Sequence, residues 1–335
     1  MSSRMSRVVR LTAVPDGLPK PEHFAVVREP VPVPGEGEVL VRNRFFQVFP
    51  ALRTLIGGGV KGTPFPPLRP GDALFGAAVG EVVAAPRDSG LHAGDLVQHW
   101  LGWREHAVMP AAECTPLDDA LPDPAAHLSQ AGVAYASLTR DARLDKGETV
   151  FVSGGSGGVG SLAGQFARRL GAGRVIGSTG SRDKADRMVR ELGYDAALVR
   201  GEGPISAQLA DAAPEGIDVL VDNVGGEQLQ AAIAAARPGA RFVLVGTLSG
   251  QLAPDRTGTT APVEIDTFQL IAKHIEMRGF GGLDAAVPWA EHFGDWLRSG
   301  DVAFPHARVR GIDHAPQALH DLIAGRHLGA VIVKP

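Results

Sequence analysis

A cluster of glycines follows a short apolar run near the middle of the chain. The stretch from Thr149 to Leu162 reads TVFVSGGSGGVGSL, and a helical pattern continues to Arg169. Gly155, Gly157 and Gly160 have the G-x-G-x-x-G spacing. Between a strand and a helix, this spacing allows a tight turn, close approach of backbone N–H groups to a pyrophosphate, and close helix–strand packing. Because a helix N-terminus also attracts anions, the stretch predicts a dinucleotide site. An ordinary glycine turn is the alternative.

The end of the next strand indicates which dinucleotide binds. Folds that select NAD place Asp or Glu there, whereas residues 177–181 read GSTGS. With Ser181 as the N-cap, Lys184 takes the third helical position, where the helix dipole disfavours a cation unless an anion compensates. The 2′-phosphate of NADP(H) is such an anion, and Arg182 and Arg200 could close the same pocket. These residues could instead be solvated surface charges, but the missing acid and the basic cluster together favour NADP(H).

Two further strand ends carry small or polar residues. Asn223 lies in the turn DNVGG after one apolar strand, and residues 246–249 (GTLS) follow the next. Open α/β folds bind ligands at the carboxyl ends of their parallel strands. Each turn alone could be structural, but with the glycine turn they predict the ribose and nicotinamide part of one site.

The order of elements predicts two domains, as does the length of 335 residues. Residues 1–123 contain short β-prone runs between Pro and Gly residues, a pattern typical of a small bent barrel. Residues 124–303 begin with a helical pattern at 127–144 and then alternate strands and helices. Their apolar strands predict an α/β, Rossmann-type doubly wound parallel sheet. Residues 304–335 are expected to return to the first domain, and residues 250–264 to form a lid or a mobile segment.

Composition limits the classes of function. The formal net charge of -4 gives no basis for a nucleic-acid or anionic-membrane partner. The N-terminus lacks the apolar core of a signal peptide and no run is long enough to span a bilayer, so we expect a cytoplasmic protein. Cys114 is the only cysteine. Without a basic neighbour it is expected to be a packed or idle thiol rather than a nucleophile.

These motifs resemble those of the zinc-free medium-chain dehydrogenase/reductases, and within them the branch of prostaglandin reductases and alkenal double-bond reductases. GGSGGVGSLAGQFAR is similar to that branch's AAxGxVGxxxGQxAK stretch, GSTGSRDKADRMVRELGYDAA to its GSxxKxxxLxxxLGFDxA stretch, and DNVGGE to its signature. Pro50 and Arg53 lie where the family has a DPYMR-like run, Gly102 and Trp103 match a GW pair, and LGAVIVKP resembles the closing LGKxIVK. The resemblance covers nearly the whole chain.

The resemblance implies an N-terminal GroES-like β-barrel catalytic domain, a Rossmann domain and a homodimer. It also implies NADPH-dependent reduction of the carbon–carbon double bond in α,β-unsaturated carbonyl compounds, with a hydrophobic enone, enal or quinone as substrate. By carry-over, residues 157–160 would hold the pyrophosphate, Lys184 the 2′-phosphate, and Asn223, residues 245–248 and residues 280–282 the ribose and nicotinamide. Together with the strand-end residues, the predicted cofactor-binding set is Ser156, Gly157, Gly158, Val159, Gly160, Ser178, Gly180, Lys184, Arg200, Asn223, Val245, Gly246, Thr247, Leu248, Phe280, Gly281 and Gly282.

The chain departs from the family near the expected substrate. The aspartate and tyrosine of the DPYMR-like run are Phe49 and Ala51, and a tyrosine near the adenosine phosphate aligns with Arg200. The family's STYN-like stretch, whose tyrosine lies by the substrate, is residues 249–252 (SGQL). The cofactor prediction is unchanged, because Arg200 is still suited to a phosphate by its charge, whereas the identity of the substrate depends on the other positions.

A catalytic zinc ion is not expected. Zinc-dependent relatives take one ligand from a Gly-His-Glu run, whose counterpart here has Gly76. The histidines show no H-E-x-x-H spacing. His99, His106, His274 and His314 are therefore expected to be surface or packing residues, and no metal site is predicted.

Without a metal, the expected reaction is a conjugate reduction. Hydride passes from the nicotinamide to the β-carbon, hydrogen-bond donors stabilise charge on the carbonyl oxygen, and a proton reaches the α-carbon from water. No residue is assigned as catalytic. Tyr135, which either faces the cleft or is buried, and Gln251, which either donates to the substrate or is solvated, are the two candidates. Tyr194 is expected to pack. Five aromatic residues are expected to line a hydrophobic pocket or, alternatively, to belong to the core: Phe45, Phe46, Phe49, Trp100 and Trp103.

Other functions fit the same motifs. An NADPH:quinone oxidoreductase could use the same site, because hydride can pass to a quinone. Reduction of a carbonyl to an alcohol is disfavoured because nothing replaces zinc as the Lewis acid. A non-catalytic NADPH-binding protein is the alternative of a different class. A panel of enones and quinones would separate these hypotheses.

Overall fold

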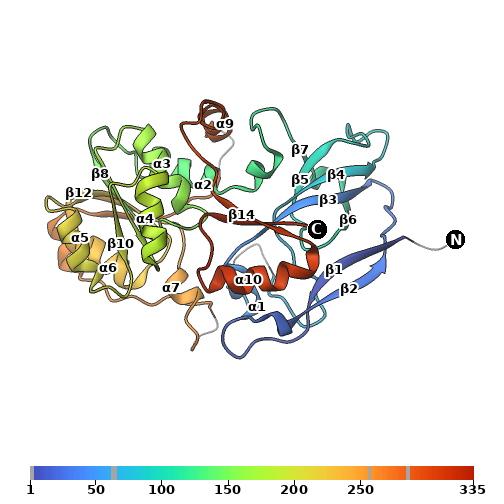
Figure 1. Cartoon of the computed structure of the whole chain (residues 1–335), viewed down its shortest axis with the longest axis horizontal. Coiled ribbons are helices and arrows are strands. Elements are labelled where there is room, and N and C mark those ends of the chain that lie inside the picture. Colours follow the sequence, from blue (N-terminus) through green and yellow to red (C-terminus); the bar gives the residue numbers. More distant parts are fainter. Residues whose placement is uncertain (1–3, 62–65, 256–257, 284–286) are drawn as a thin grey trace. The chain divides into compact units, whose positions relative to one another are not determined.

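The computed structural model of the chain describes residues 4–61, 66–255, 258–283 and 287–335 (Figure 1). The chain divides into two compact units. Unit 1 comprises residues 1–128, 254–259 and 306–335, and unit 2 comprises residues 129–253 and 260–305.

Unit 1 is mainly β-structure. β1 (Met5–Leu11) pairs antiparallel with β2 (Phe24–Pro30). A seven-stranded sheet has the order β14-β15-β3-β4-β5-β7, and β6 pairs with β3. Its N-terminal strands are β3 (Glu38–Val48), β4 (Ala78–Ala84), β5 (Leu96–His99), β6 (His106–Pro110) and β7 (Thr115–Pro116). The short helical elements are η1 (Pro21–His23), α1 (Leu52–Ile56), η2 (Ala111–Glu113) and η3 (Pro124–Leu128). Alternate apolar residues such as Val39, Val41 and Val97 are fully buried and form a core beneath this sheet.

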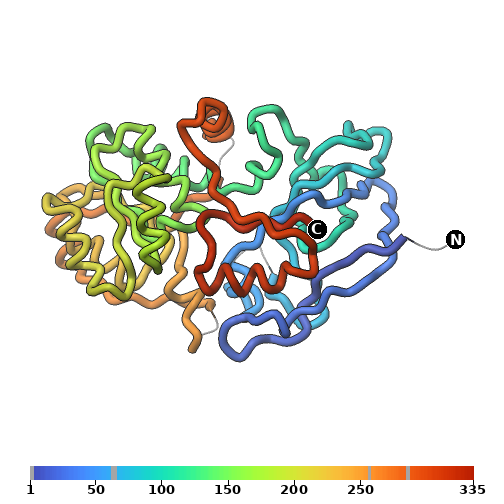
Figure 2. Tube along the Cα trace, viewed as in Figure 1, coloured from blue at the N-terminus to red at the C-terminus, as the bar shows by residue number. Residues whose placement is uncertain are grey.

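The C-terminal tail adds two strands to the same sheet. It contains β14 (His306–Arg310), η5 (Ile312–His314), α10 (Ala315–Ile323) and β15 (Ala330–Lys334). β15 pairs antiparallel with β3 and parallel with β14, and the red end of the trace in Figure 2 follows this path. The tail therefore belongs to the N-terminal sheet.

Unit 2 contains a six-stranded parallel sheet in the order β10-β9-β8-β11-β12-β13. The strands are β8 (Thr149–Val152), β9 (Arg174–Thr179), β10 (Ala196–Val199), β11 (Ile217–Asp222), β12 (Ala236–Leu244) and β13 (Glu276–Gly279). This is the strand order of a Rossmann sheet, and the fold-class prediction is confirmed. The order reverses between β8 and β11, so the carboxyl ends of these two strands flank the point where such sheets bind ligands.

Helices on both faces of the sheet explain why its strands are apolar throughout. The connecting helices are α3 (Gly160–Arg169), α4 (Arg182–Glu191), α5 (Ile205–Ala212) and α6 (Gly226–Ala235). α5 and α6 pack against each other over a core that includes Phe151, Leu220 and Phe242 (Figure 1). Right-handed connections place α3 and α4 on the opposite face, so residues of both strand faces are buried.

The helix expected over residues 127–144 is divided into pieces. α2 (Ala131–Ala136) is continued by a π-helical turn, η4 (Ser137–Asp141). The other helices of unit 2 are α7 (Leu248–Gln251), α8 (Thr267–Ala272) and α9 (Trp289–Ser299). Residues 256 and 257 of the expected lid lie outside the described residues. Among the described residues, each helix is too short or too polar to cross a membrane.

Candidate functional site

The glycine turn joins β8 to α3 at the carboxyl edge of the sheet. Gly154 has a φ of 62°, a backbone conformation that favours glycine. The N–H of Gly157 donates to Gly154 O at 3.0 Å. A Cβ on Gly160 would lie 2.3 Å from that same oxygen, so α3 starts in direct contact with the turn. This close packing is the arrangement that the G-x-G-x-x-G spacing requires.

Tyr194 packs behind the turn. A Cβ on Gly155, Gly164 or Gly177 would come within 3.0 Å of the Tyr194 ring or hydroxyl. The hydroxyl donates to Gly160 O at 2.7 Å, and burial raises its pKa. The prediction that Tyr194 packs is confirmed. The structure adds that three glycines in three different elements make room for this ring, which sequence spacing could not reveal.

Two serine hydroxyls fix the turn to the neighbouring strand. Ser178 accepts from the N–H of Gly154 at 2.9 Å and donates to the side-chain oxygen of Gln228. It is fully buried, so its hydroxyl supports the turn from behind. The Ser156 hydroxyl bonds to that of Thr179 at 2.8 Å. Ser156 and Ser178, both in the predicted cofactor set, thus hold the backbone that would face the pyrophosphate.

The end of β9 brings two cations together. Ser181 is the N-cap of α4, its hydroxyl accepts from the N–H of Lys184 at 3.3 Å, and Lys184 is the third helical residue, as predicted. A Cβ on Gly180 would lie 3.3 Å from a terminal nitrogen of Arg200. Burial and the Arg200 charge lower the pKa of Lys184, against an opposing effect of Asp183. A phosphate between Lys184 and Arg200 would relieve this repulsion.

Arg182 has a different environment. It forms an ion pair with Glu202, and 60% of its side chain is exposed. Its charge is therefore already compensated. This arrangement separates Arg182 from the Lys184–Arg200 pair, although the sequence grouped all three.

A buried carboxylate organises the end of β11. Asp222 is 1% exposed and accepts from the hydroxyl of Ser153 and from the N–H groups of Val224 and Gly225. The amide of Asn223 donates to Ser153 O at 2.8 Å. Asn223 is thus fixed against the end of β8. Asp222 was missed as a site residue, although it is the first letter of the DNVGG motif.

The turns after β12 and β13 are held mainly by backbone bonds. The N–H groups of Val245 and Gly246 both donate to Asp222 O, at 2.7 and 3.0 Å, and that of Leu248 donates to Asn223 O at 3.1 Å. Thr247 is the residue before α7, whose last residue is Gln251. The strand-end residues predicted for the ribose and nicotinamide therefore follow adjacent strands β11 and β12.

Phe280 extends the ladder between β12 and β13. Its N–H donates to Leu244 O at 2.9 Å. Gly281 and Gly282 follow, are exposed, and Gly282 has a φ of 85°. The predicted residues 280–282 therefore begin at the carboxyl edge of the sheet, next to the turn after β12.

Tyr135 lies in an aromatic cluster of unit 2. It is 7% exposed. Its ring stacks on His292 at 5.3 Å between centroids and lies near Phe166 and Trp296, at 6.3 and 6.2 Å. These contacts support the packing interpretation of Tyr135 over a catalytic role.

Burial disfavours the charged forms of Cys114 and His99 in unit 1. Burial, with a smaller effect of Glu113, raises the pKa of Cys114 to about 11. His99 is 2% exposed, bonds to Asn43 Oδ1 at 2.9 Å and accepts from the N–H of Leu101. Burial, aided by Arg104, lowers its pKa to about 4. His106 is likewise buried and bonded to Ser6, and His274 and His314 are exposed. The thiol is a packed side chain, and these histidines are packing or surface residues, as predicted.

The described residues of unit 1 do not fit a catalytic zinc ion. A Cβ on Gly76 would lie 2.9 Å from the ring of Phe49, so a histidine ligand there would displace that ring. Phe46 and Trp103 are fully buried and pack at 5.4 Å, whereas Trp100 is 53% exposed. Two of the five aromatic residues proposed for a pocket therefore belong to the core. Within the described part of the chain, no group of three or more His, Cys, Asp and Glu residues could hold a metal ion.

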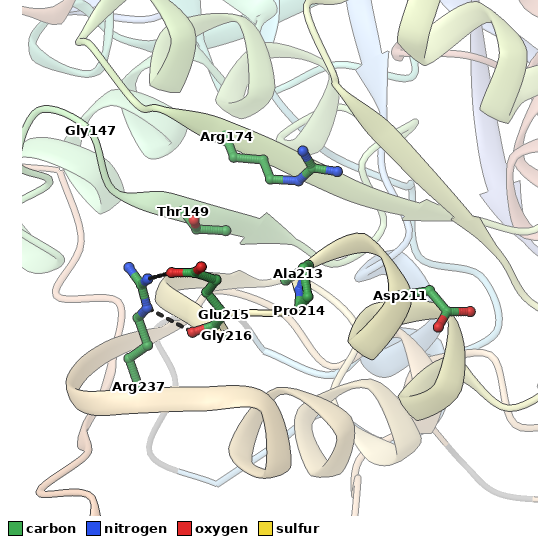
Figure 3. Close-up of a pocket in the computed structure, with 9 residues that line it drawn as sticks. All are labelled: Gly147, Thr149, Arg174, Asp211, Ala213, Pro214, Glu215, Gly216 and Arg237. Atoms are coloured by element: carbon green, nitrogen blue, oxygen red, sulfur yellow. Dashed lines mark hydrogen bonds and ion pairs between the residues drawn. The ribbon is translucent and has the colours of Figure 1, made fainter.

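A groove of about 350 Å³ lies at the other edge of the unit 2 sheet (Figure 3). Thr149 and Arg174 begin β8 and β9, so the groove is at the amino ends of these strands. Arg237 pairs there with Glu215 and with Asp218. Ligands of such sheets bind at the carboxyl ends, and the groove is therefore not the candidate site.

Two family models match the chain. The model described as the N-terminal domain of oxidoreductase matches residues 7–117. The model described as zinc-binding dehydrogenase matches residues 158–295. The 2-alkenal reductase (NADP(+)-dependent) of Nicotiana tabacum is 31% identical over 89% of this chain and 88% of its own length. The chain belongs to the medium-chain dehydrogenase/reductase superfamily and, within it, to the branch of alkenal and prostaglandin reductases.

Two further proteins are similar over nearly their whole length. The NADPH-dependent curcumin reductase of Escherichia coli is 27% identical over 97% of this chain and 95% of its own. The crystal structure of CurA in complex with NADPH from Vibrio vulnificus superimposes with a TM-score of 0.87, at 27% identity and 98% coverage of both chains.

Proposed function

We propose that this protein, an NADPH-dependent oxidoreductase, reduces the carbon–carbon double bond of α,β-unsaturated carbonyl compounds without zinc. Relatives named for reduction of 2-alkenals, curcumin and (+)-pulegone support this substrate class. Those residues of unit 1 that the structure describes do not fit a zinc site, so no step of the proposed reaction uses a metal.

The observation that carries the proposal is the cation pair at the end of β9. Arg200 lies next to the exposed Gly180, its charge acts on Lys184, and residues 177–181 at the end of the strand include no acid. An adenosine ribose that carries a 2′-phosphate fits this environment, whereas an unphosphorylated ribose finds no carboxylate acceptor there. We assign the 2′-phosphate to Lys184 and Arg200.

The other predicted residues take their roles from the turns in which they lie. When bound, NADPH supplies a hydride. Residues 156–160 would hold its pyrophosphate at the N-terminus of α3. Asn223, residues 245–248 and residues 280–282 would then fix the ribose and nicotinamide at the carboxyl edge of the sheet. Positioning of this kind can supply much of the rate enhancement.

Two steps of the reaction involve groups other than the cofactor: stabilisation of the carbonyl oxygen and protonation of the α-carbon. The charge that develops on the carbonyl oxygen requires a hydrogen-bond donor. The protonation step needs no strong acid from the chain. Gln251, at the end of α7 and three residues after Leu248, is the candidate donor in unit 2. We assign the proton on the α-carbon to water, because the contacts of Tyr135 are those of a packing residue.

The remaining proposals concern organisation. We propose a GroES-like catalytic domain at residues 1–123 with 304–335, and an NADP-binding Rossmann domain at residues 124–303. We also propose that the protein acts as a homodimer in the cytoplasm on a small hydrophobic molecule, without nucleic acid or membrane.

A substrate panel tests the function. The purified protein is mixed with NADPH and, in turn, an alkenal, an enone, a naphthoquinone and a saturated ketone, with and without a zinc chelator. We expect NADPH oxidation with the alkenal and the enone, unchanged by the chelator. Turnover of the quinone alone would support the quinone oxidoreductase hypothesis instead. Binding of NADPH with no turnover would support a non-catalytic protein.

A further inference from the structure

The helical segment made of α2 and the π-helical turn η4 contacts the chain after β13. The guanidinium carbon of Arg140 lies 5.5 Å from the centre of the Phe280 ring. A Cβ on Gly281 would lie 3.4 Å from a terminal nitrogen of the same guanidinium. Arg140 is therefore next to the first two residues of the segment 280–282. π-helical turns within helices occur frequently at functional sites.

Asp141 fixes the orientation of this guanidinium. Arg140 Nε donates to Asp141 Oδ1 at 3.0 Å, and a terminal nitrogen donates to Oδ2 at 2.8 Å. The Asp141 side chain is 6% exposed and that of Arg140 is 31% exposed. A two-point bond to a buried carboxylate has little freedom, so the cation is held over the Phe280 ring, which is a favourable arrangement.

The other end of the same helical segment also contacts this stretch. A Cβ on Gly132, in the first turn of α2, would lie 2.9 Å from Leu283 Cδ2 and 3.2 Å from the Trp289 ring. The absence of a side chain at Gly132 lets these two residues pack against α2. Leu283 and Trp289 thus lie against α2, and Phe280 and Gly281 lie against Arg140.

We propose that Arg140 is a positioning residue for the nicotinamide end of the cofactor site. It fixes Phe280 and Gly281, and through them the surface that would meet the nicotinamide, without touching substrate. The inference rests on the proposed function, because residues 280–282 are assigned to the nicotinamide there. It adds a residue that no motif of the sequence marks.

The test compares two ligands. NADPH uses both ends of the site, whereas adenosine 2′,5′-bisphosphate uses only the end with Lys184 and Arg200. For Arg140→Met we expect NADPH affinity to fall about fivefold, because the unsupported Phe280 must be ordered when the nicotinamide binds, with adenosine 2′,5′-bisphosphate affinity unchanged within about twofold. The emission of bound NADPH, which reports the surroundings of the nicotinamide, should also change. Arg140→Lys, which keeps the cation, should recover part of the affinity.

Arg143→Met is the matched control. Arg143 belongs to the same stretch of chain but pairs with Glu276, at the start of β13, so its loss should leave the binding of both ligands unchanged. Equal loss of both ligands in Arg140→Met, or no loss of either, would overturn the inference. If Arg140→Met does not fold, Phe280→Leu is expected to weaken NADPH binding and to leave adenosine 2′,5′-bisphosphate binding unchanged. Equal effects of Phe280→Leu on the two ligands would also overturn the inference. These outcomes concern binding, so they are distinct from failure of the wild-type protein to reduce an enone.

Discussion

The two ends of the candidate cofactor site are built from different interactions. At the end of β9, Arg200 lies beside the exposed Gly180, and burial together with the Arg200 charge lowers the pKa of Lys184. At the ends of β12 and β13, backbone N–H groups of Val245, Gly246 and Phe280 fix the turns. One end can therefore select a cofactor by its charge, whereas the other can only set where a ring lies.

The glycine turn lies between the two ends of the site. A substitution that disrupts this turn should have the largest effect on stability and on cofactor affinity. In Gly160→Ala, the new methyl group would meet Gly154 O at 2.3 Å. We expect the free energy of unfolding of unit 2 to fall by about 2–3 kcal/mol and the affinities for NADPH and NADH to fall together by about 100-fold. Thermal unfolding and calorimetry measure these changes.

Gly158→Ala is the control for stability, because a Cβ there meets only Gln130 Cγ at 3.5 Å. It should unfold at the wild-type temperature. Equal destabilisation by the two substitutions would contradict the close approach of α3 to the turn.

Lys184→Ala should break only the charged end. Loss of one charge-assisted hydrogen bond, ~2 kcal/mol, corresponds to an NADPH affinity about thirtyfold lower, with NADH affinity unchanged. Arg182→Ala is the matched control. Because Arg182 is paired with Glu202, we expect a change of less than about threefold. Titrations with both cofactors distinguish the outcomes, and an equal loss for NADPH and NADH in Lys184→Ala would remove the 2′-phosphate assignment.

The lowered pKa of Lys184 predicts a pH dependence at the same end. As the pH rises through that pKa, the ammonium group loses its proton, and binding of the anionic 2′-phosphate must take the proton up again. NADPH affinity should therefore fall as the pH is raised from neutral toward the ordinary lysine pKa of about 10.4, while NADH affinity stays constant. In Lys184→Arg the guanidinium stays charged and the pH dependence should vanish. A fall of the same size for NADH would assign the titration to another group.

The smallest effect is expected behind the turn. Tyr194→Phe removes the hydrogen bond to Gly160 O but keeps the ring against the three glycines. We expect a loss of about 1 kcal/mol in the free energy of unfolding and little change in affinity for either cofactor. Tyr194→Leu, which leaves part of that space empty, should be more destabilising. The reverse order in chemical denaturation would contradict the packing role.

Local signals were sufficient to predict much of this molecule. The alternation of apolar strands and helices gave the doubly wound sheet, and Ser181 followed by Lys184 gave the cap of α4 and the position of the cation. These features depend on residues that are close together in the sequence. The spacing of residue types is therefore sufficient to predict them.

The features that were not predicted depend on residues far apart in the chain. Tyr194 contacts glycines of three elements, Asp222 organises a turn through Ser153, and the partner of Arg182 is Glu202. The π-helical turn that places Arg140 over Phe280 falls within a pattern that predicted one continuous helix. No periodicity reports such contacts, because they arise only when the sheet is assembled.

The most direct measurement of the central claim follows the hydride. The protein is supplied with NADPH that carries deuterium at the transferred position and with an α,β-unsaturated ketone, and the product is analysed by NMR. The account predicts a saturated ketone with deuterium on the β-carbon, formed equally well in the presence of a zinc chelator. An allylic alcohol with deuterium on the carbinol carbon, or turnover that is lost with zinc, would contradict it.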